Sequence, residues 1–214
     1  MLLFALTLLA CDLPKPEDLE CVDVLQLTAD ATPDGDPSGV SYCWTDDVNA
    51  GGFDRGSSEA CSTDVGLDYC DPTMSDTSAC ATDDDCEPGW SCLTGSWDVD
   101  YACGCVHTCT TDDDCDAGEA CLCAAGLETG GGSFLYSGFH RECMPADCGS
   151  AADCGGEACG LSKDICNWGV AGLYCRTSED ECRVDSDCAS MPNGFCGYSS
   201  DLGRWTCQEA ALCE

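Results

Sequence analysis

Hydrophobic positions are concentrated at the start of the chain and become sparse beyond it. Residues 1–10 are almost continuously apolar and lead directly to Cys11. Apolar and polar residues then alternate in part along 22–27 and 40–44. Because a strand presents successive side chains to opposite faces, both segments are predicted to be short strands. Residues 32–39, between them, are dense in Pro, Asp, Gly and Ser and predict a turn.

Composition indicates that hydrophobic burial alone does not hold this chain together. Val, Ile, Leu and Phe account for 33 of the 214 residues, about 15%. A share below ~20% with a large net charge normally indicates disorder, but the 25 cysteines, about 12% of the chain, exceed the ~8–10% typical of disulfide scaffolds. Crosslinks lower the entropy of the unfolded state and so stabilise a chain with little apolar surface to bury. We therefore predict a small disulfide-rich protein, mostly loops with short β-hairpins, few helical turns and little hydrophobic core.

A four-fold internal repeat begins at residue 80. Each copy opens with two cysteines separated by five residues, and an aspartate precedes the second cysteine in every copy. Such self-similarity indicates tandem copies of one small unit. The repeats are predicted at 80–108, 109–147, 148–181 and 182–214. Before them lie a leader at 1–10, a tether at 11–20 and a small N-terminal β module at 21–79 with two disulfides of its own.

Disulfide pairing is expected within each repeat. The third cysteine and a later one, which often follows an aromatic residue, are predicted to lie on the two strands of a hairpin. We expect the first cysteine to bond the third, and the second to bond this later one, which is Cys103 in the first repeat. Cys105, Cys123, Cys166 and Cys213 are left over and are expected to bridge repeats, although spacing alone leaves other connectivities open. The cysteines assigned to disulfides are Cys80, Cys86, Cys92, Cys109, Cys115, Cys121, Cys143, Cys148, Cys154, Cys159, Cys175, Cys182, Cys188, Cys196 and Cys207.

The beginning of the chain resembles a bacterial lipoprotein signal peptide. Leu8, Leu9 and Ala10 before Cys11 are similar to a lipobox, in which the cysteine is lipidated and becomes the first residue of the mature chain. Ten residues are too few to span a bilayer but suit the apolar part of a signal peptide, although no Lys or Arg precedes them. A buried N-terminal strand or helix is the alternative. The resemblance implies a lipid-anchored, extracytoplasmic protein of the bacterial cell envelope, in the periplasm or at the cell surface, where the remaining 24 cysteines can pair.

The cysteine and aspartate spacing of 80–213 resembles small disulfide modules of the Dickkopf N-terminal and EGF-like types. It is more similar to the Cys-x5-Cys-x5-Cys arrays of bacterial cysteine-rich lipoproteins. The resemblance implies the module fold and its disulfides. It carries over no functional residue, because only the spacing matches.

The strongly negative charge of the chain favours binding of cations over binding of nucleic acids. The net charge of −34, from 41 acidic and 7 basic residues, repels phosphate and argues against a nucleic-acid partner. No cofactor is predicted apart from calcium, for which aspartates at alternate positions offer hard oxygen ligands, although no EF-hand loop is present. The alternative is that these carboxylates accept backbone hydrogen bonds and build turns. The candidate calcium ligands are Asp83, Asp85, Asp112, Asp114, Asp185 and Asp187.

Catalytic motifs do not occur in the sequence. Gly-x-Ser-x-Gly, His-Glu-x-x-His and Cys-x2-Cys are all missing, and there are only two histidines. We therefore predict that the protein is not an enzyme and has a structural or binding role. The alternatives are a secreted-type enzyme inhibitor or small enzyme, and a calcium-dependent adhesion module.

The longest cysteine-free insertion among the repeats is the candidate recognition surface. Residues 130–141 combine glycines with aromatic side chains, which favours an exposed loop or hairpin that contacts a protein or glycan partner. The alternative is that these aromatic side chains only cover neighbouring disulfides. The candidate binding residues are Phe134, Tyr136, Phe139, His140 and Arg141.

Overall fold

The computed structural model describes residues 19–26, 37–46, 50–62, 70, 79–94, 103–123, 125–128, 134–137, 141–164 and 170–211. Among these residues the chain forms short strands, 3₁₀ turns and loops, and no α-helix. This arrangement confirms the predicted fold class. Eleven disulfides join the described elements. Such crosslinking is characteristic of an oxidising compartment.

The secondary structure consists of short elements throughout. The strands are β1 (Glu20–Gln26), β2 (Pro37–Trp44), β3 (Gly52–Arg55), β4 (Trp90–Thr94), β5 (Cys103–His107), β6 (Glu119–Leu122), β7 (Ala125–Glu128), β8 (Phe134–Ser137), β9 (Glu142–Pro145), β10 (Cys159–Lys163), β11 (Val170–Cys175), β12 (Gly194–Ser199) and β13 (Arg204–Glu209). The 3₁₀ turns are η2 (Asp83–Asp85), η3 (Asp112–Asp114) and η4 (Asp185–Cys188).

A seven-stranded sheet forms the centre of the molecule, in the order β11-β10-β3-β2-β1-β7-β8. The two strands predicted from alternation, β1 and β2, pair antiparallel, and β2 then pairs with β3. β3 also pairs with β10, where Phe53 lies opposite Leu161. The N-terminal strands and the hairpin of residues 159–175 therefore share one sheet, which brings together segments more than a hundred residues apart.

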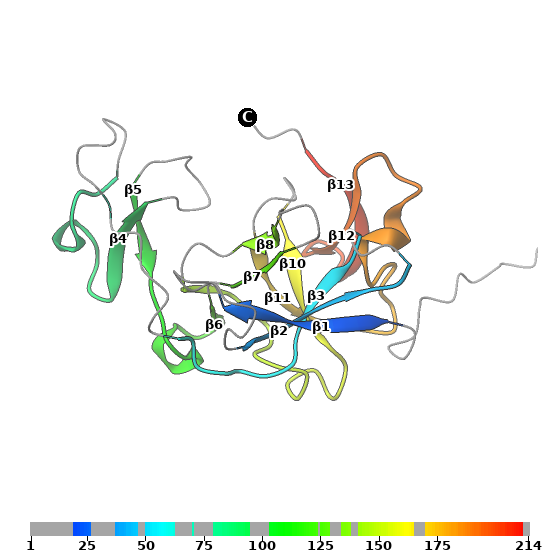
Figure 1. Cartoon of the computed structure of the whole chain (residues 1–214), viewed down its shortest axis with the longest axis horizontal. Coiled ribbons are helices and arrows are strands. Elements are labelled where there is room, and N and C mark those ends of the chain that lie inside the picture. Colours follow the sequence, from blue (N-terminus) through cyan, green and yellow to red (C-terminus); the bar gives the residue numbers. More distant parts are fainter. Residues whose placement is uncertain are drawn as a thin grey trace, which may run out of the picture.

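Three separate two-stranded sheets accompany this sheet, namely the hairpins β4–β5 and β12–β13 and the pair β6–β9, whose strands are separated in the chain by β7 and β8. The β4–β5 hairpin stands apart from the sheet at one end of the molecule, and β12–β13 lies at the opposite end (Figure 1). Hairpins this small bury little apolar surface of their own, so each depends on its crosslinks.

The hydrophobic core is small and lies mainly on the central sheet. Its largest cluster gathers Val24, Val40, Tyr42, Phe53 and Leu161 with residues of β6, β11 and the cysteines beside them. The other three clusters consist mostly of cysteine, and one of them adds the fully buried Trp205. In these three smaller clusters, buried cysteines therefore take the place that aliphatic side chains have in an ordinary hydrophobic core.

Candidate functional site

Four segments that begin at Cys80, Cys109, Cys148 and Cys182 share one disulfide pattern, and we call them the first to fourth cysteine segments. In each segment the first cysteine bonds the third, and the second bonds a fourth on the returning strand. The pairs are Cys80–Cys92, Cys86–Cys105, Cys109–Cys121, Cys115–Cys143, Cys148–Cys159, Cys154–Cys175, Cys182–Cys196 and Cys188–Cys207. In each segment three of these sulfurs lie within 4.8 Å of one another, so the two disulfides pack together.

The expected pairing is confirmed in three segments and differs in the first. There the fourth cysteine is Cys105 and not Cys103, because the register of β4 and β5 places Cys92 opposite Cys105. Cys103 lies two residues before Cys105, at the start of β5, and bonds Cys70. The third and fourth cysteines lie on paired strands, as predicted, and the register places them directly opposite each other in all four segments.

The leftover cysteines were expected to bridge repeats, but among the described residues Cys105 pairs inside the first segment, and the long links run from the N-terminal region to Cys123 and Cys103. Cys123 bonds Cys61, and Cys103 bonds Cys70. Two disulfides within 21–79 were expected, but only Cys21–Cys43 forms inside that region. The sequence gives no local signal for these long links. Cys11, Cys166 and Cys213 lie outside the described residues.

A carboxylate closes the first turn of each cysteine segment. The aspartate before the second cysteine accepts the N–H groups of the two residues that follow the first cysteine. In the first segment Asp85 Oδ2 lies 2.9 Å from the nitrogen of Ala81 and 3.0 Å from that of Thr82. The same pair of bonds is made by Asp114, Asp153 and Asp187. The aspartate common to all four repeats therefore shapes the turn between the first two cysteines.

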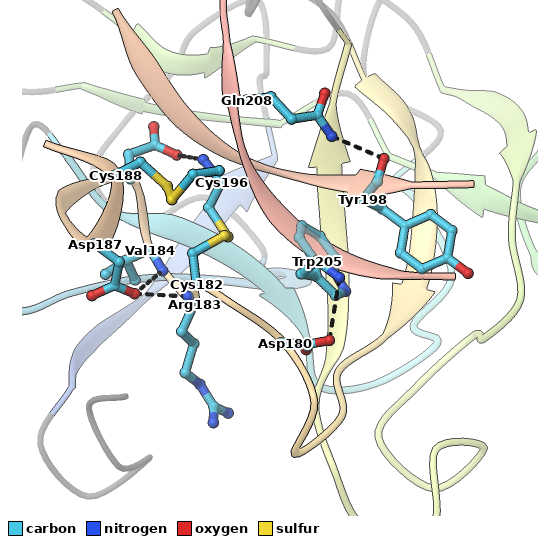
Figure 2. The surroundings of a disulfide bond; sticks show 12 residues. Asp180, Cys182, Arg183, Val184, Asp187, Cys188, Cys196, Tyr198, Trp205 and Gln208 are labelled. Carbon is cyan, nitrogen blue, oxygen red and sulfur yellow. Dashed lines mark hydrogen bonds between the residues drawn. A yellow bond between two sulfur atoms is a disulfide. The ribbon is translucent and has the colours of Figure 1, made fainter. Parts of the chain in front are cut away.

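These hydrogen bonds also change the acidity of the exposed carboxyls. Donation from the backbone N–H groups holds the pKa of Asp85, Asp114 and Asp153 below the usual 3.8. Figure 2 shows the arrangement in the fourth segment, where Asp187 faces the two backbone nitrogens of residues 183 and 184 beside the disulfide. For Asp85, Asp114 and Asp153 the charged carboxylate is thus the form that the fold favours.

A second aspartate links the turn to the hairpin in three of the four segments. Asp83, Asp112 and Asp185 each accept the N–H of the third cysteine of their segment, at 2.8, 2.8 and 3.0 Å. The third segment has Ala151 at this position and lacks the bond. All six candidate calcium ligands therefore accept backbone hydrogen bonds, as the turn-building alternative predicts. Calcium binding itself stays a prediction.

Two buried arginines join the central sheet to the cysteine segments. The guanidinium of Arg55 donates to Asp112 in the second segment, with Nη2 and Oδ1 2.9 Å apart. On the other side of the sheet, Arg176 pairs with Asp54 at 3.4 Å and lies 3.6 Å from the ring centroid of Trp205. Burial lowers the pKa of Arg176, and the nearby carboxylates oppose that change. Each arginine stabilises one junction between units.

The predicted recognition residues are only partly described. Phe134 and Tyr136 lie in β8, at one end of the sheet order. Phe139 and His140 lie outside the described residues. Arg141 is half-buried, and its Nη1 donates to the Ser62 carbonyl at 3.4 Å. Of the predicted set, Arg141 is thus the residue whose surroundings the structure describes.

Arg141 lines an open hollow of about 330 Å³ together with Gly89, His107 and Asp114. The His107 ring stacks on Trp90, with centroids 5.2 Å apart and planes inclined by 11°. Trp90 is 37% exposed. Among the described residues, no carboxylate lies within ion-pair distance of Arg141, whereas Arg55, Lys163, Arg176 and Arg204 all have such a partner. We call this feature the Arg141 hollow.

Sequence reasoning found neither His107, which lines the hollow, nor Trp90, which stacks on the His107 ring. The signal that identifies them is the β4–β5 register, in which Trp90 and His107 lie directly opposite each other. Cross-strand neighbours of this kind interact, but their pairing becomes visible only when the hairpin register is known.

No protein-family model, no curated protein and no solved structure matches the chain. Within the part of the chain that the structure describes, there is no helix with the length and apolar character needed to cross a membrane. The fold and the arrangement of residues therefore carry the functional argument.

Proposed function

We propose that this protein is a lipid-anchored, extracytoplasmic cysteine-rich protein of the bacterial cell envelope with a binding role. The observation that carries the proposal is the set of eleven disulfides, with at least one inside every unit described. Crosslinks of this density persist outside the reducing cytoplasm. The resemblance of residues 8–11 to a lipobox supports the anchor, and no catalytic role is proposed for any residue.

The Arg141 hollow is the surface that this proposal assigns to binding. A stacked Trp–His pair offers an aromatic platform, and the adjacent Arg141, which has no carboxylate within ion-pair distance among the described residues, offers hydrogen-bond donors to a polar partner. Aromatic and arginine side chains are the residue types that dominate recognition sites. A protein or glycan surface with carbonyl, hydroxyl or carboxylate groups fits this combination.

Intact mass spectrometry tests the location and the crosslinks together. Membranes of bacteria that express the full gene are solubilised and the protein is alkylated without reductant. We expect a mass that begins at Cys11 and includes the acyl groups, with no alkylated cysteine. The Cys11→Ser variant should lose the acyl mass and leave the membrane fraction. An unprocessed wild-type chain would contradict the anchor, and many alkylated thiols would contradict the scaffold.

Binding is tested with glycan and protein arrays probed by the oxidised protein. Arg141→Gln and His107→Ala should each weaken a specific signal. Arg204→Gln is the control because Arg204 lies in the fourth segment, in an exposed ion pair with Glu181. A signal that survives both hollow variants would contradict this site. Loss of the signal in chelator, together with a calcium-dependent rise in melting temperature, would favour the calcium-dependent adhesion module. Inhibition of enzymes in a proteinase panel would favour the enzyme inhibitor.

A further inference from the structure

Two tyrosine rings lie face to face at the junction of the third and fourth cysteine segments. Tyr174 belongs to β11 and Tyr198 to β12, and their ring centroids are 3.9 Å apart with planes inclined by only 5°. Aromatic pairs in proteins usually have centroids about 4.5–7 Å apart. These two rings are therefore in full contact across their faces, and both are half-buried, so they remain accessible from solvent.

The surrounding structure holds this pair in register. The backbone N–H of Tyr198 donates to Ser162 Oγ on β10 at 2.9 Å, which fixes β12 against the central sheet. The Tyr198 ring also meets the edge of Trp205, its cross-strand partner, at 6.2 Å. Trp205 is fully buried beneath the guanidinium of Arg176. The contact therefore depends on buried groups of both segments and not on loose surface side chains.

We propose that Tyr174 and Tyr198 are a modification site at which one-electron oxidation forms an intramolecular dityrosine crosslink. Hydrogen peroxide, used by a haem peroxidase, is the oxidant. Each phenol loses one electron and one proton, and the two phenoxyl radicals form a carbon–carbon bond between ring positions ortho to the hydroxyls. The two ortho hydrogens then move to the oxygens. Overall, two tyrosines and one hydrogen peroxide give one dityrosine and two waters.

Proximity favours coupling within this pair over coupling between molecules. Two groups held in contact react as if each faced the other at a very high local concentration, up to about 10⁵ M or more in well-oriented cases. Burial raises the pKa of both phenols, and the charge of Asp147 raises it further in each. Both phenols are therefore neutral at physiological pH.

The chemistry of the surrounding cysteines also favours this product. A thiol would reduce a phenoxyl radical before it could couple. The described cysteines of these two segments are all in disulfides, so none of them offers a thiol. The crosslink would join residues 24 positions apart and, unlike every disulfide, would survive reductant. The inference depends neither on the lipid anchor nor on the Arg141 hollow.

The test is peroxidase and hydrogen peroxide applied to the dilute, oxidised protein, followed by reduction, proteolysis and mass spectrometry. We expect a monomer lighter by two hydrogen atoms, dityrosine fluorescence, and one crosslinked peptide that joins Tyr174 to Tyr198. Tyr174→Phe and Tyr198→Phe should each lower the intramolecular yield roughly tenfold or more. A disulfide map identical to that of the wild-type chain shows that each variant is folded.

A reduced, alkylated and denatured chain is the matched control. It retains all six tyrosines but not the stacked geometry, so its crosslinks should be scattered among them. The proposal is overturned if the folded protein yields no Tyr174–Tyr198 peptide. It is equally overturned if the denatured chain yields that peptide as selectively, or if either Phe variant keeps the wild-type yield.

Discussion

Arg55 and Asp112 form the ion pair that joins the central sheet to the second cysteine segment. The Arg55 side chain is 2% exposed, and its Nη2 lies 2.9 Å from Asp112 Oδ1. That same oxygen accepts the N–H of Cys121 at 2.8 Å. One carboxylate oxygen therefore holds both the local turn and the contact between units. Asp83 has the corresponding place in the first segment, where its side chain accepts only the N–H of Cys92 among the described residues.

This difference predicts unequal effects of two matched substitutions. Asp112→Ala leaves the buried Arg55 charge without its partner and should cost about 3–5 kcal/mol of unfolding free energy. Asp83→Ala removes one hydrogen bond to a backbone group and should cost about 1–2 kcal/mol. Denaturant unfolding of the oxidised variants measures both. Equal losses would show that the Arg55–Asp112 pair adds nothing beyond the turn.

Gly160 marks a close contact between the sheet and the fourth segment. A Cβ atom at this position would lie 2.5 Å from Trp205 Cζ2 and 2.6 Å from Arg176 Nε, both buried. Gly160→Ala should therefore cost about 1–3 kcal/mol through overpacking. Gly56→Ala is the control because its nearest neighbour would be 3.9 Å away, and it should change stability by less than about 0.5 kcal/mol. A stable Gly160→Ala variant would contradict this packing.

Local patterns identified the parts of the fold that depend on local chemistry. Alternation predicted β1 and β2, and cysteine spacing predicted the double disulfide and the hairpin of each segment. The choice between Cys103 and Cys105 was wrong in the sequence analysis, because the β4–β5 register decides it and an aromatic neighbour does not. An aromatic residue near a cysteine carries no information about whether that cysteine lies opposite Cys92.

Long-range pairing accounts for what the sequence did not predict. The union of β3 with β10 and the Cys61–Cys123 bond both join distant segments, and no local composition signals them. The Arg141 hollow has the same origin, since His107 and Arg141 come from different segments. Buried partners such as Arg55 also look like ordinary surface cations in the sequence.

The turn carboxylates predict how stability depends on pH. The pKa of Asp85, Asp114 and Asp153 is lower in the folded chain than its usual 3.8, because backbone N–H groups donate to the charged form. Their contribution is therefore fully present above the unfolded pKa and is lost as pH falls from about 4 through the folded values. The melting temperature should be flat above pH 5 and fall below pH 4. A triple Asp→Asn variant at these positions should melt at a lower temperature near neutral pH and show a shallower acid slope. An unchanged slope would contradict the role of these carboxylates.

The disulfide between Cys61 and Cys123 should stabilise the protein more than its neighbour Cys109–Cys121. The two bonds pack in one cluster, but they close loops of very different length, with sequence separations of 62 and 12. In the chain-entropy model, the longer loop corresponds to about 4 kcal/mol and the shorter to about 3 kcal/mol. Double Cys→Ser variants of each pair, unfolded by denaturant without reductant, measure the difference. A larger loss for Cys109–Cys121 would contradict this ranking. Full reduction with alkylation should abolish cooperative melting, because the remaining core is too small to offset the conformational entropy.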